Sequence, residues 1–365
     1  MLYLSIDQHR KHLTTNMRNE SGDILLKRQV GTDWKRVREF FEDLRRKAEL
    51  EGGFVAILEV CGFNDWLLKM LKEYGCRETI LVQPEKRSKR KTDRRDANAL
   101  GEILWVNRER LLAGKRVQGV RRVYPPTELA AENRQITAVR KRMGQFRTRV
   151  VNRIRGILNK HNLWQECPTK GIQTLRAIRW LRQLRLGPID RMEMDHLLAQ
   201  WELCDRQMDA VEAEIEVRQA ADKTAQLLAS IPGSGAYASL ALASRIGPIE
   251  RFPHPGSLAN YWGLTPRCAN SGETTDRLGS ITKEGSAMAR FILGQLVLHV
   301  LRKDHVLRSW HRRIKHRRGA KIGRVAVMRR LTTIIEQMIK HNQRYVIGGL
   351  PGPGGEGRED KKGGT

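Results

Sequence analysis

The sequence predicts an α/β domain at its N-terminus, followed by a helical connector and a helical C-terminal domain. Short apolar runs alternate with helical patterns up to residue 106, which is typical of an α/β fold. From residue 127 to 161 a long amphipathic pattern without proline predicts one continuous helix. We therefore expect domains at residues 1–106, 107–222 and 223–345, and a tail at 346–365 whose composition cannot bury a core and should be disordered.

The N-terminal domain has a distinctive order of predicted elements. Three strands come first, a helix and a strand follow, and two further helices are separated by one short strand. The predicted strands cover residues 2–7, 13–17, 24–30, 54–59 and 79–82, and the predicted helices cover 34–50, 65–74 and 93–106. This order, with acids after the first and fourth strands and on the last helix, is the arrangement of the ribonuclease H and RuvC folds.

Four acids of this domain could converge on one place. Asp7 and Glu59 end apolar strands, where a carboxylate is costly unless it serves a partner or a cation. Asp93 and Asp96 lie about one turn apart on the same side of the last helix. Together they would offer oxygen ligands to Mg²⁺ or Mn²⁺, and a pair of such ions can clamp a phosphodiester. Alternatively, the two helix acids belong to a solvated helix start and pair with their basic neighbours Lys91, Arg94 and Arg95.

The chain is strongly basic, with 68 Lys and Arg residues against 40 Asp and Glu residues and a net charge of +28. Such an excess indicates a polyanionic partner, either nucleic acid or an anionic membrane surface. No apolar run is long enough to cross a membrane and the N-terminus lacks a signal pattern, so we expect a nucleic-acid-binding protein of the cytoplasm. Five scattered cysteines without a Cys-x-x-Cys pair support neither a disulfide framework nor a zinc site.

The predicted helix over 127–161 has a one-sided charge distribution. Its polar face is almost entirely basic, whereas a structural coiled coil would normally alternate charge signs. We therefore expect it to lie along a phosphate backbone, with contacts from Arg140, Lys141, Arg142, Arg149 and Arg153. A later helix, expected over 194–221, is comparatively acidic and could pack against the basic helix of the same chain or of a second subunit.

The C-terminal domain carries two glycine-containing segments. Residues 231–235, Ile-Pro-Gly-Ser-Gly, are typical of a helix-hairpin-helix, in which Gly233 and Gly235 would let backbone N–H groups approach a phosphate. An ordinary helical turn would show the same pattern. Residues 259–285 are rich in glycine and hydroxyl groups, with Lys283 nearby, and Arg324 follows in the last predicted helix. By residue chemistry alone, the Ser-Gly pair that begins at Ser271 is most often a turn.

Several short motifs, taken in their order along the chain, resemble the insertion sequence 110 transposases. This family is also called the DEDD transposases or bridge-RNA-guided recombinases. The motifs are Asp7, Glu59-Val-Cys-Gly62, Lys91-Thr-Asp-Arg-Arg-Asp-Ala97, Ile231-Pro-Gly-Ser-Gly235, Gly263-Leu-Thr-Pro266, Ser271-Gly272 and Ile281-Thr-Lys-Glu-Gly285. The resemblance extends from residue 2 to about residue 345. One departure is Gln8-His9-Arg10 after the first Asp, where the family more usually has a small residue and a lysine.

The resemblance implies a recombinase that cuts and rejoins DNA strands. Asp7, Glu59, Asp93 and Asp96 would hold Mg²⁺ (or Mn²⁺) near the scissile phosphate, and a serine would attack it. Ser271 is the first choice for that serine and Ser280 the second. The family also implies a bridge RNA that pairs with donor and target DNA, a coiled-coil region used for assembly into a dimer or tetramer, and association with the prokaryotic nucleoid.

Two other functions stay open on the sequence. A metal-dependent endonuclease similar to Holliday-junction resolvases would use water as the nucleophile, and its serine would only contact DNA. An RNA-binding or architectural protein would use the four acids structurally and would cleave no strand. A covalent protein–DNA adduct distinguishes the recombinase from both.

Overall fold

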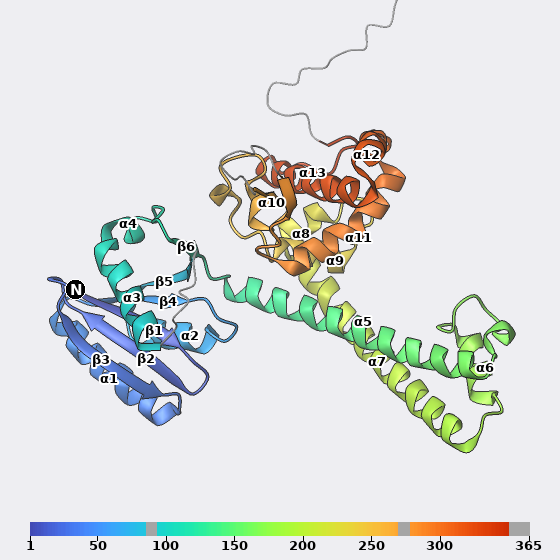
Figure 1. The fold of residues 1–365 in the computed structure, drawn as a ribbon, viewed down its shortest axis with the longest axis horizontal. Coiled ribbons are helices and arrows are strands. Elements are labelled where there is room, and N and C mark those ends of the chain that lie inside the picture. The colour runs from blue at the N-terminus through green and yellow to red at the C-terminus, as the bar shows by residue number, and fades with distance from the viewer. Residues whose placement is uncertain (85–92, 269–277, 350–365) are drawn as a thin grey trace, which may run out of the picture. The chain divides into compact units, whose positions relative to one another are not determined.

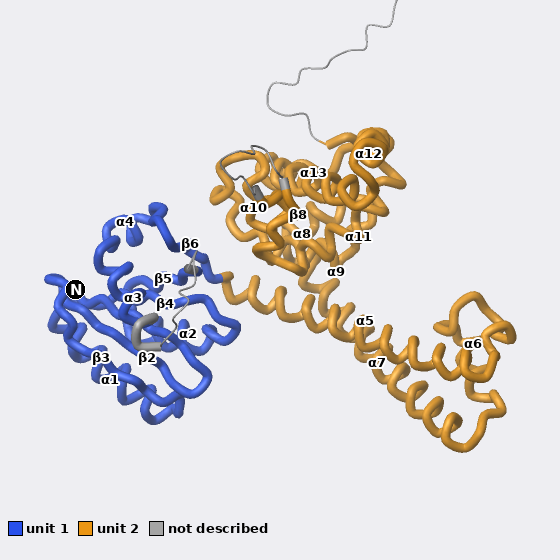
Figure 2. The backbone as a smooth tube through the Cα atoms, viewed as in Figure 1, with its two compact units in different colours: residues 1–125 blue, residues 126–365 orange. Residues whose placement is uncertain are grey.

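The structure is a computed structural model that describes residues 1–84, 93–268 and 278–349. The chain divides into two compact units, Met1–Pro125 and Pro126–Thr365, which are described separately (Figure 2). Each unit has its own buried apolar core. Among the described residues, no helix has the length and apolarity that crossing a bilayer requires.

Unit 1 is built on one six-stranded sheet with the order β3-β2-β1-β4-β5-β6 (Figure 1). Its first three strands are antiparallel neighbours, and β4 and β5 run parallel to β1. The bounds are β1 Leu2–Gln8, β2 His12–Arg18, β3 Ile24–Gly31, β4 Phe54–Glu59, β5 Cys76–Pro84 and β6 Val120–Val123. The order of strands and helices predicted from the sequence is therefore confirmed up to residue 106.

The last strand of this sheet was not expected from the sequence. Strand β6 lies within residues 107–126, at the start of the range 107–222 for which the sequence predicts a connector. It pairs antiparallel with β5, from Leu81 opposite Val123 to Pro84 opposite Val120. Because this pairing adds the stretch to the sheet, unit 1 extends to Pro125 instead of ending at residue 106.

Helices cover both faces of the sheet because side chains alternate along each strand. Leu4 and Ile6 of β1 point into a core shared with α1 (Trp34–Leu50) and α2 (Asp65–Glu73). Tyr3, with the opposite parity, belongs to a second core shared with α3 (Asp93–Val106) and α4 (Arg108–Leu112). With both faces covered, strands β1 and β4 are buried almost along their whole length. The sequence favours Thr92 as the N-cap of α3, but this residue lies outside the described residues.

Unit 2 begins with two long helices that lie side by side, α5 (Glu128–Lys160) and α7 (Pro188–Ala221), joined through α6 (Leu175–Gln183) (Figure 1). The sequence left open whether the acidic helix pairs within the chain, and the structure shows that it does. Ion pairs link the helices in antiparallel order: Glu132–Arg218 (2.9 Å), Arg140–Glu212 (2.6 Å), Arg147–Asp205 (3.0 Å), Arg153–Glu193 (2.8 Å) and Lys160–Asp190 (2.8 Å). Exposed pairs of this kind contribute about 0–1 kcal/mol each, so they set the alignment more than the stability.

The stability of the helical pair comes mainly from an apolar cluster at its far end, which includes Ile154, Leu158, Leu197 and Trp201. Helix α7 starts earlier than the expected residue 194. Pro188 occupies its first turn, where a missing N–H costs nothing, and Gly187 precedes it as the cap.

The rest of unit 2 packs around a single large core. Its helices are α8 (Lys223–Leu228), α9 (Ala236–Ala243), α10 (Ser257–Tyr261), α11 (Ala287–Lys303), α12 (His305–Arg318) and α13 (Ala320–Lys340). The sequence predicts a wholly helical domain here, but β7 (Pro266–Cys268) and β8 (Leu278–Ile281) form an antiparallel pair of strands. This pair flanks residues 269–277, which the structure does not describe.

The chain beyond α13 is anchored by one buried carboxylate. Asp304 caps α12 and accepts hydrogen bonds from the Tyr345 hydroxyl (2.6 Å) and the Gly348 backbone N–H (2.7 Å). Burial by itself would raise the pKa of Asp304, but these hydrogen bonds lower it below its ordinary value. The chain is therefore held to the folded unit as far as Gly348, beyond residue 346 where the sequence predicts that the tail begins. Residues 350–365 lie outside the described chain.

Two backbone segments, one containing Gly263 and the other Gly285, touch at the base of the β7–β8 pair; we call this contact the glycine crossing. Gly263 has φ +68°, and a Cβ there would overlap the backbone of Glu284. Gly285 has φ +76°, and a Cβ there would overlap the Tyr261 carbonyl oxygen. The Arg290 guanidinium donates to the carbonyls of Trp262 (2.9 Å) and Glu284 (3.0 Å) across the same crossing. Only glycine fits at both positions, which explains two of the short motifs in physical terms.

Replacing Gly285 with Ala should lower the free energy of unfolding by about 3 kcal/mol, through left-handed strain and the overlap with Tyr261. The matched control is Gly294→Ala on α11, where an added Cβ meets no atom and the helix gains about 0.5–1 kcal/mol. Urea denaturation of both variants measures the difference. Equal unfolding midpoints for the two variants would show that the crossing is not tight.

Candidate functional site

Two of the predicted carboxylates sit at adjacent positions of the sheet. Strands β1 and β4 are parallel neighbours whose last registered pair is Ile6 with Leu58, so Asp7 and Glu59 follow at the next step on each strand. Tyr3 lies an even number of residues before Asp7 on β1, and Ile57 lies two residues before Glu59 on β4. Both Tyr3 and Ile57 pack into the core shared with α3. By the strand period of two, Asp7 and Glu59 face that same side. The structure thus brings these two residues together at one edge, facing the helix that begins with Asp93.

Helix α3 is fixed on β1 immediately next to these acids. The Ser5 hydroxyl donates to the Ala97 carbonyl (2.7 Å), and the Asn16 amide donates to the Asn98 side chain (2.9 Å). The helix can lie this close because residue 101 is glycine, where a Cβ would come within 2.9 Å of the Ser5 hydroxyl. Asp93 and Asp96 therefore lie within the one helical turn of α3 that precedes Ala97, the residue bonded to β1.

The side chains of Asp93 and Asp96 lie outside what the structure describes. Among the described side chains, no three His, Cys, Asp or Glu residues gather into a metal-binding group. Asp7 and Glu59 alone offer only oxygen donors, the kind that Mg²⁺ and Mn²⁺ prefer. The donor chemistry of this edge therefore fits those ions.

The residue after Asp7, a departure from the family pattern, organises the neighbouring loop. Gln8 donates to the Phe63 carbonyl (2.9 Å) and accepts from the Asn64 amide (2.8 Å). Asn64 in turn accepts from the Cys61 backbone N–H (2.6 Å). Burial raises the pKa of the Cys61 thiol, and the charges of Glu59 and Asp7 raise it further, which disfavours the thiolate form.

A polar hollow of about 550 Å³ lies beside the carboxylate edge, and sequence reasoning missed it. It is lined from strands β2 and β3 and from the start of α3 by Thr14, Thr15, Asn16, Lys27, Arg28, Gln29, Ala97 and Asn98. Thr14 is paired with Asp7 across the sheet, and its hydroxyl is buried without a hydrogen-bond partner among the described residues. The alternation of polar residues at 14 and 16 and at 27 and 29 could have indicated it. Such a surface suits hydrogen bonding to a polar ligand next to Asp7.

The cations that we assigned to nucleic acid have different surroundings. Arg140 is bonded to Glu212 and lies over the Tyr237 ring, with 4.6 Å from its guanidinium carbon to the ring centroid. Lys141 lies 4.5 Å from the centre of the Phe291 ring, and Arg153 is bonded to Glu193. Arg142 and Arg149 are exposed and line a hollow on the α5–α7 pair. Within the described chain, neither has an acidic partner, so these two are the most available for an external anion.

The remaining predicted contacts lie in the last part of unit 2. Gly233 has φ +82°, and a Cβ there would overlap His299 of α11, so its packing alone requires glycine. Gly235 precedes α9 and has open space around it. Lys283 is exposed and has φ +57°, next to the glycine crossing, and Arg324 is exposed on α13. Ser280 is exposed on β8, whereas Ser271 lies outside the described residues.

Comparison with known proteins gives two family matches that together cover most of the chain. Residues 4–163 match the model of a DEDD transposase family, described as a transposase, and residues 225–312 match the transposase IS116/IS110/IS902 family. The transposase for insertion sequence element IS1111A from Coxiella burnetii is 26% identical over 82% of this chain and 81% of its own length.

Two other relatives cover the chain to a similar extent. A probable family 20 transposase from Pseudomonas aeruginosa is 22% identical over 85% of this chain and 88% of its own length. The putative transposase y4rJ from Sinorhizobium fredii is 28% identical over 80% of this chain and 79% of its own length. The matches therefore extend across both units.

The Ser5→Ala variant tests how α3 is held at the carboxylate edge. Losing the bond from Ser5 to Ala97 should cost about 1 kcal/mol and speed amide hydrogen exchange in the first turns of α3. Ser21→Ala, in the exposed turn between β2 and β3, is the matched control and should change neither quantity. Unchanged exchange in α3 of the Ser5 variant would contradict this anchoring role.

Proposed function

Because this chain belongs to the IS110 family of transposases, we propose that it cuts and rejoins DNA strands at the ends of an insertion sequence, with four carboxylates and a serine. The carboxylates are Asp7, Glu59, Asp93 and Asp96, and the serine is Ser271. The observation that carries this proposal is the position of Asp7 and Glu59, side by side on adjacent parallel strands and facing the helix that begins with Asp93.

The carboxylates are proposed to hold Mg²⁺ or Mn²⁺, which would neutralise the charge that develops on the phosphoryl oxygens. Asp7 is almost fully buried, at 9% exposure, and its carboxylate is 3.0 Å from the His9 imidazole. Such a position fixes the carboxylate before any substrate arrives. The anchoring of α3 on Ser5 and Asn16 would do the same for the two helix acids.

Ser271 is proposed as the nucleophile. Its oxygen would bond to phosphorus while the bond from phosphorus to the leaving strand's oxygen breaks, and the phosphoserine would keep the bond energy for rejoining. The glycine crossing and the β7–β8 pair fix both ends of the segment 269–277 that contains this serine. Ser280 is the second candidate, because it is exposed on β8.

Nucleic acid is proposed to bind several basic places of the chain. Exposed Arg142, Arg149, Lys283 and Arg324, together with the open start of α9 at Gly235 in a helix-hairpin-helix, supply contacts to phosphates. Arg140, Lys141 and Arg153, which we also propose as phosphate contacts, have partners on other helices as well: Glu212, Phe291 and Glu193, respectively. The partners would be donor DNA, target DNA and a bridge RNA, and the nucleoid-associated protein would work as a dimer or tetramer with its helical pair as a coiled coil.

Mn²⁺ should stabilise the protein if the carboxylates bind it. At a metal concentration 100 times the dissociation constant, the free energy of unfolding should rise by about 2.7 kcal/mol. Asp7→Asn and Glu59→Gln should each abolish most of this gain together with strand cleavage, whereas Asp43→Asn on the outer face of α1 should keep both. Thermal unfolding with and without EDTA measures the gain. An equal gain in the Asp7 and Asp43 variants would remove Asp7 from the metal site.

Trapping a covalent protein–DNA complex tests the nucleophile. After denaturation, wild type should carry labelled DNA on residue 271, and Ser271→Ala should lose the complex while Ser280→Ala keeps it. If instead strands are cut with no adduct in any variant, water is the nucleophile and the protein acts as a resolvase-like endonuclease. Peptide mapping of the modified residue decides between the two serines.

A further inference from the structure

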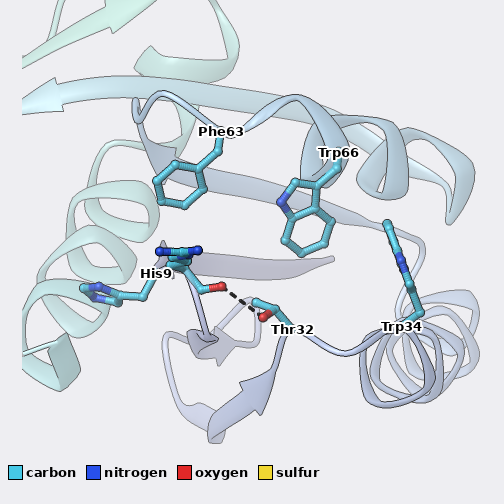
Figure 3. Close-up of a pocket in the computed structure, with 6 residues that line it drawn as sticks. His9, Thr32, Trp34, Phe63 and Trp66 are labelled. Carbon is cyan, nitrogen blue, oxygen red and sulfur yellow. Dashed lines mark hydrogen bonds between the residues drawn. The ribbon is translucent and has the colours of Figure 1, made fainter.

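An aromatic hollow opens at the same edge of the sheet as Asp7, in unit 1 (Figure 3). Its volume is about 490 Å³, and its lining comes from three separate connections and the helix starts that follow two of them: His9 and Arg10 after β1, Thr32 and Trp34 at the start of α1, and Phe63 and Trp66 at the start of α2. Two hydrogen bonds tie the first two connections together, from the Thr32 hydroxyl to the Arg10 carbonyl (3.1 Å) and from the Thr32 N–H to the Lys11 carbonyl (3.1 Å). The hollow is therefore a built part of the fold.

The aromatic rings of this hollow are unusually exposed. Trp34 is 55% exposed and Phe63 is 44% exposed, although the core of unit 1 begins directly beneath them. Figure 3 shows Phe63 and Trp66 on one side of the hollow, before and within the start of α2, and Trp34 across from them at the start of α1. Trp34 and Trp66 meet edge to face, with ring centroids 5.7 Å apart. Exposed rings in a group of this kind mark a binding surface.

Two arginines lie next to the rings of this hollow. Arg10 is exposed at the rim, and the Arg38 guanidinium carbon lies 6.0 Å from the centre of the Trp34 ring. Arginines beside exposed aromatic faces are the combination by which proteins bind single-stranded nucleic acid, with bases stacked on rings and phosphates on cations. A purely apolar partner would leave these charges without a counterpart.

The hollow is continuous with the carboxylate edge. His9 lines the hollow and contacts the Asp7 carboxylate at 3.0 Å. Gln8, between them in sequence, holds the Phe63 carbonyl at 2.9 Å. A nucleotide whose base lies in the hollow would therefore have its sugar-phosphate within a few residues of the metal-binding edge.

We propose that this hollow binds one unpaired nucleobase of a nucleic-acid strand and so positions the strand beside Asp7. The proposal rests on the proposed function only in taking nucleic acid as the substrate. A base inside a duplex has no free face to offer the rings, so the hollow is specific for a nucleotide that is single-stranded or turned out of the helix.

The test uses the full-length protein in EDTA and a single-stranded oligothymidine that carries one 2-aminopurine. Wild type should quench the fluorescence of this base on binding, as stacking on a ring does. Trp34→Ala should bind the single strand about tenfold more weakly and lose the quenching, whereas Trp34→Phe should stay within about twofold of wild type. Affinity for the matching duplex should be unchanged in both variants. Phe63→Ala, in a loop, repeats the test if the Trp34→Ala variant unfolds.

Three results would overturn the proposal: unchanged affinity and quenching in both alanine variants, an equal loss of affinity for duplex and single strand, or a change of oligomeric mass showing that the rings form a protein interface. Since EDTA prevents cleavage, base binding is measured independently of the carboxylates and of Ser271. If quenching persists in EDTA while the separate trapping experiment with metal ions yields no adduct, the serine mechanism alone is refuted. Adduct formation without quenching would refute the hollow alone.

Discussion

The parallel pairing of β1 with β4 is the constraint on which the candidate active site depends. It sets Asp7 and Glu59 at the same height, and the alternation of side chains turns both toward α3. A slip by one residue would turn each carboxylate into the core under α1 and α2, where a charge without partners is strongly unfavourable. The register is secured because Leu4, Ile6, Ala56 and Leu58 must fill that core instead. Packing on one face thus determines where the chemistry of the other face lies.

Unit 2 uses charge in two different ways. Part of the basic excess of α5 is matched by the acids of α7, so it aligns two helices of the same chain. Near the start of α5, Arg134 and Arg245 take part in the contact between α5 and the end of α9. Arg245 donates to the Arg134 carbonyl (3.2 Å) and to the Thr137 hydroxyl (3.1 Å). Burial lowers the pKa of Arg245 to about 10, yet the group stays charged at neutral pH. Net charge alone therefore overstates how many cations can meet phosphates.

In unit 2, glycines at close backbone contacts determine how neighbouring segments are placed, as strand register does in unit 1. Gly263 and Gly285 let two backbone segments touch at the base of the β7–β8 pair, and Gly233 lets the turn before α9 touch α11. Each of these positions lies in one of the short motifs on which the resemblance in the sequence rests. Packing alone thus explains why residues 233 and 285 are glycine, independently of any contact to nucleic acid.

The sequence by itself determined the elements of unit 1, the long basic helix and the acids at the strand ends, because these depend on local periodicity. It did not determine strand β6, whose four residues become a strand by pairing with the outer edge of β5. It also did not determine the β7–β8 pair, which lies next to the glycine crossing. It also could not distinguish Arg140 from Arg142, since facing α7 or facing solvent is a property of helix packing. The aromatic hollow at Trp34 was likewise decided by tertiary structure, because it gathers side chains from separate segments that no local pattern joins. The polar hollow at Thr14 left a trace in the alternation of polar residues on β2 and β3, but its wall from α3 depends on how that helix packs.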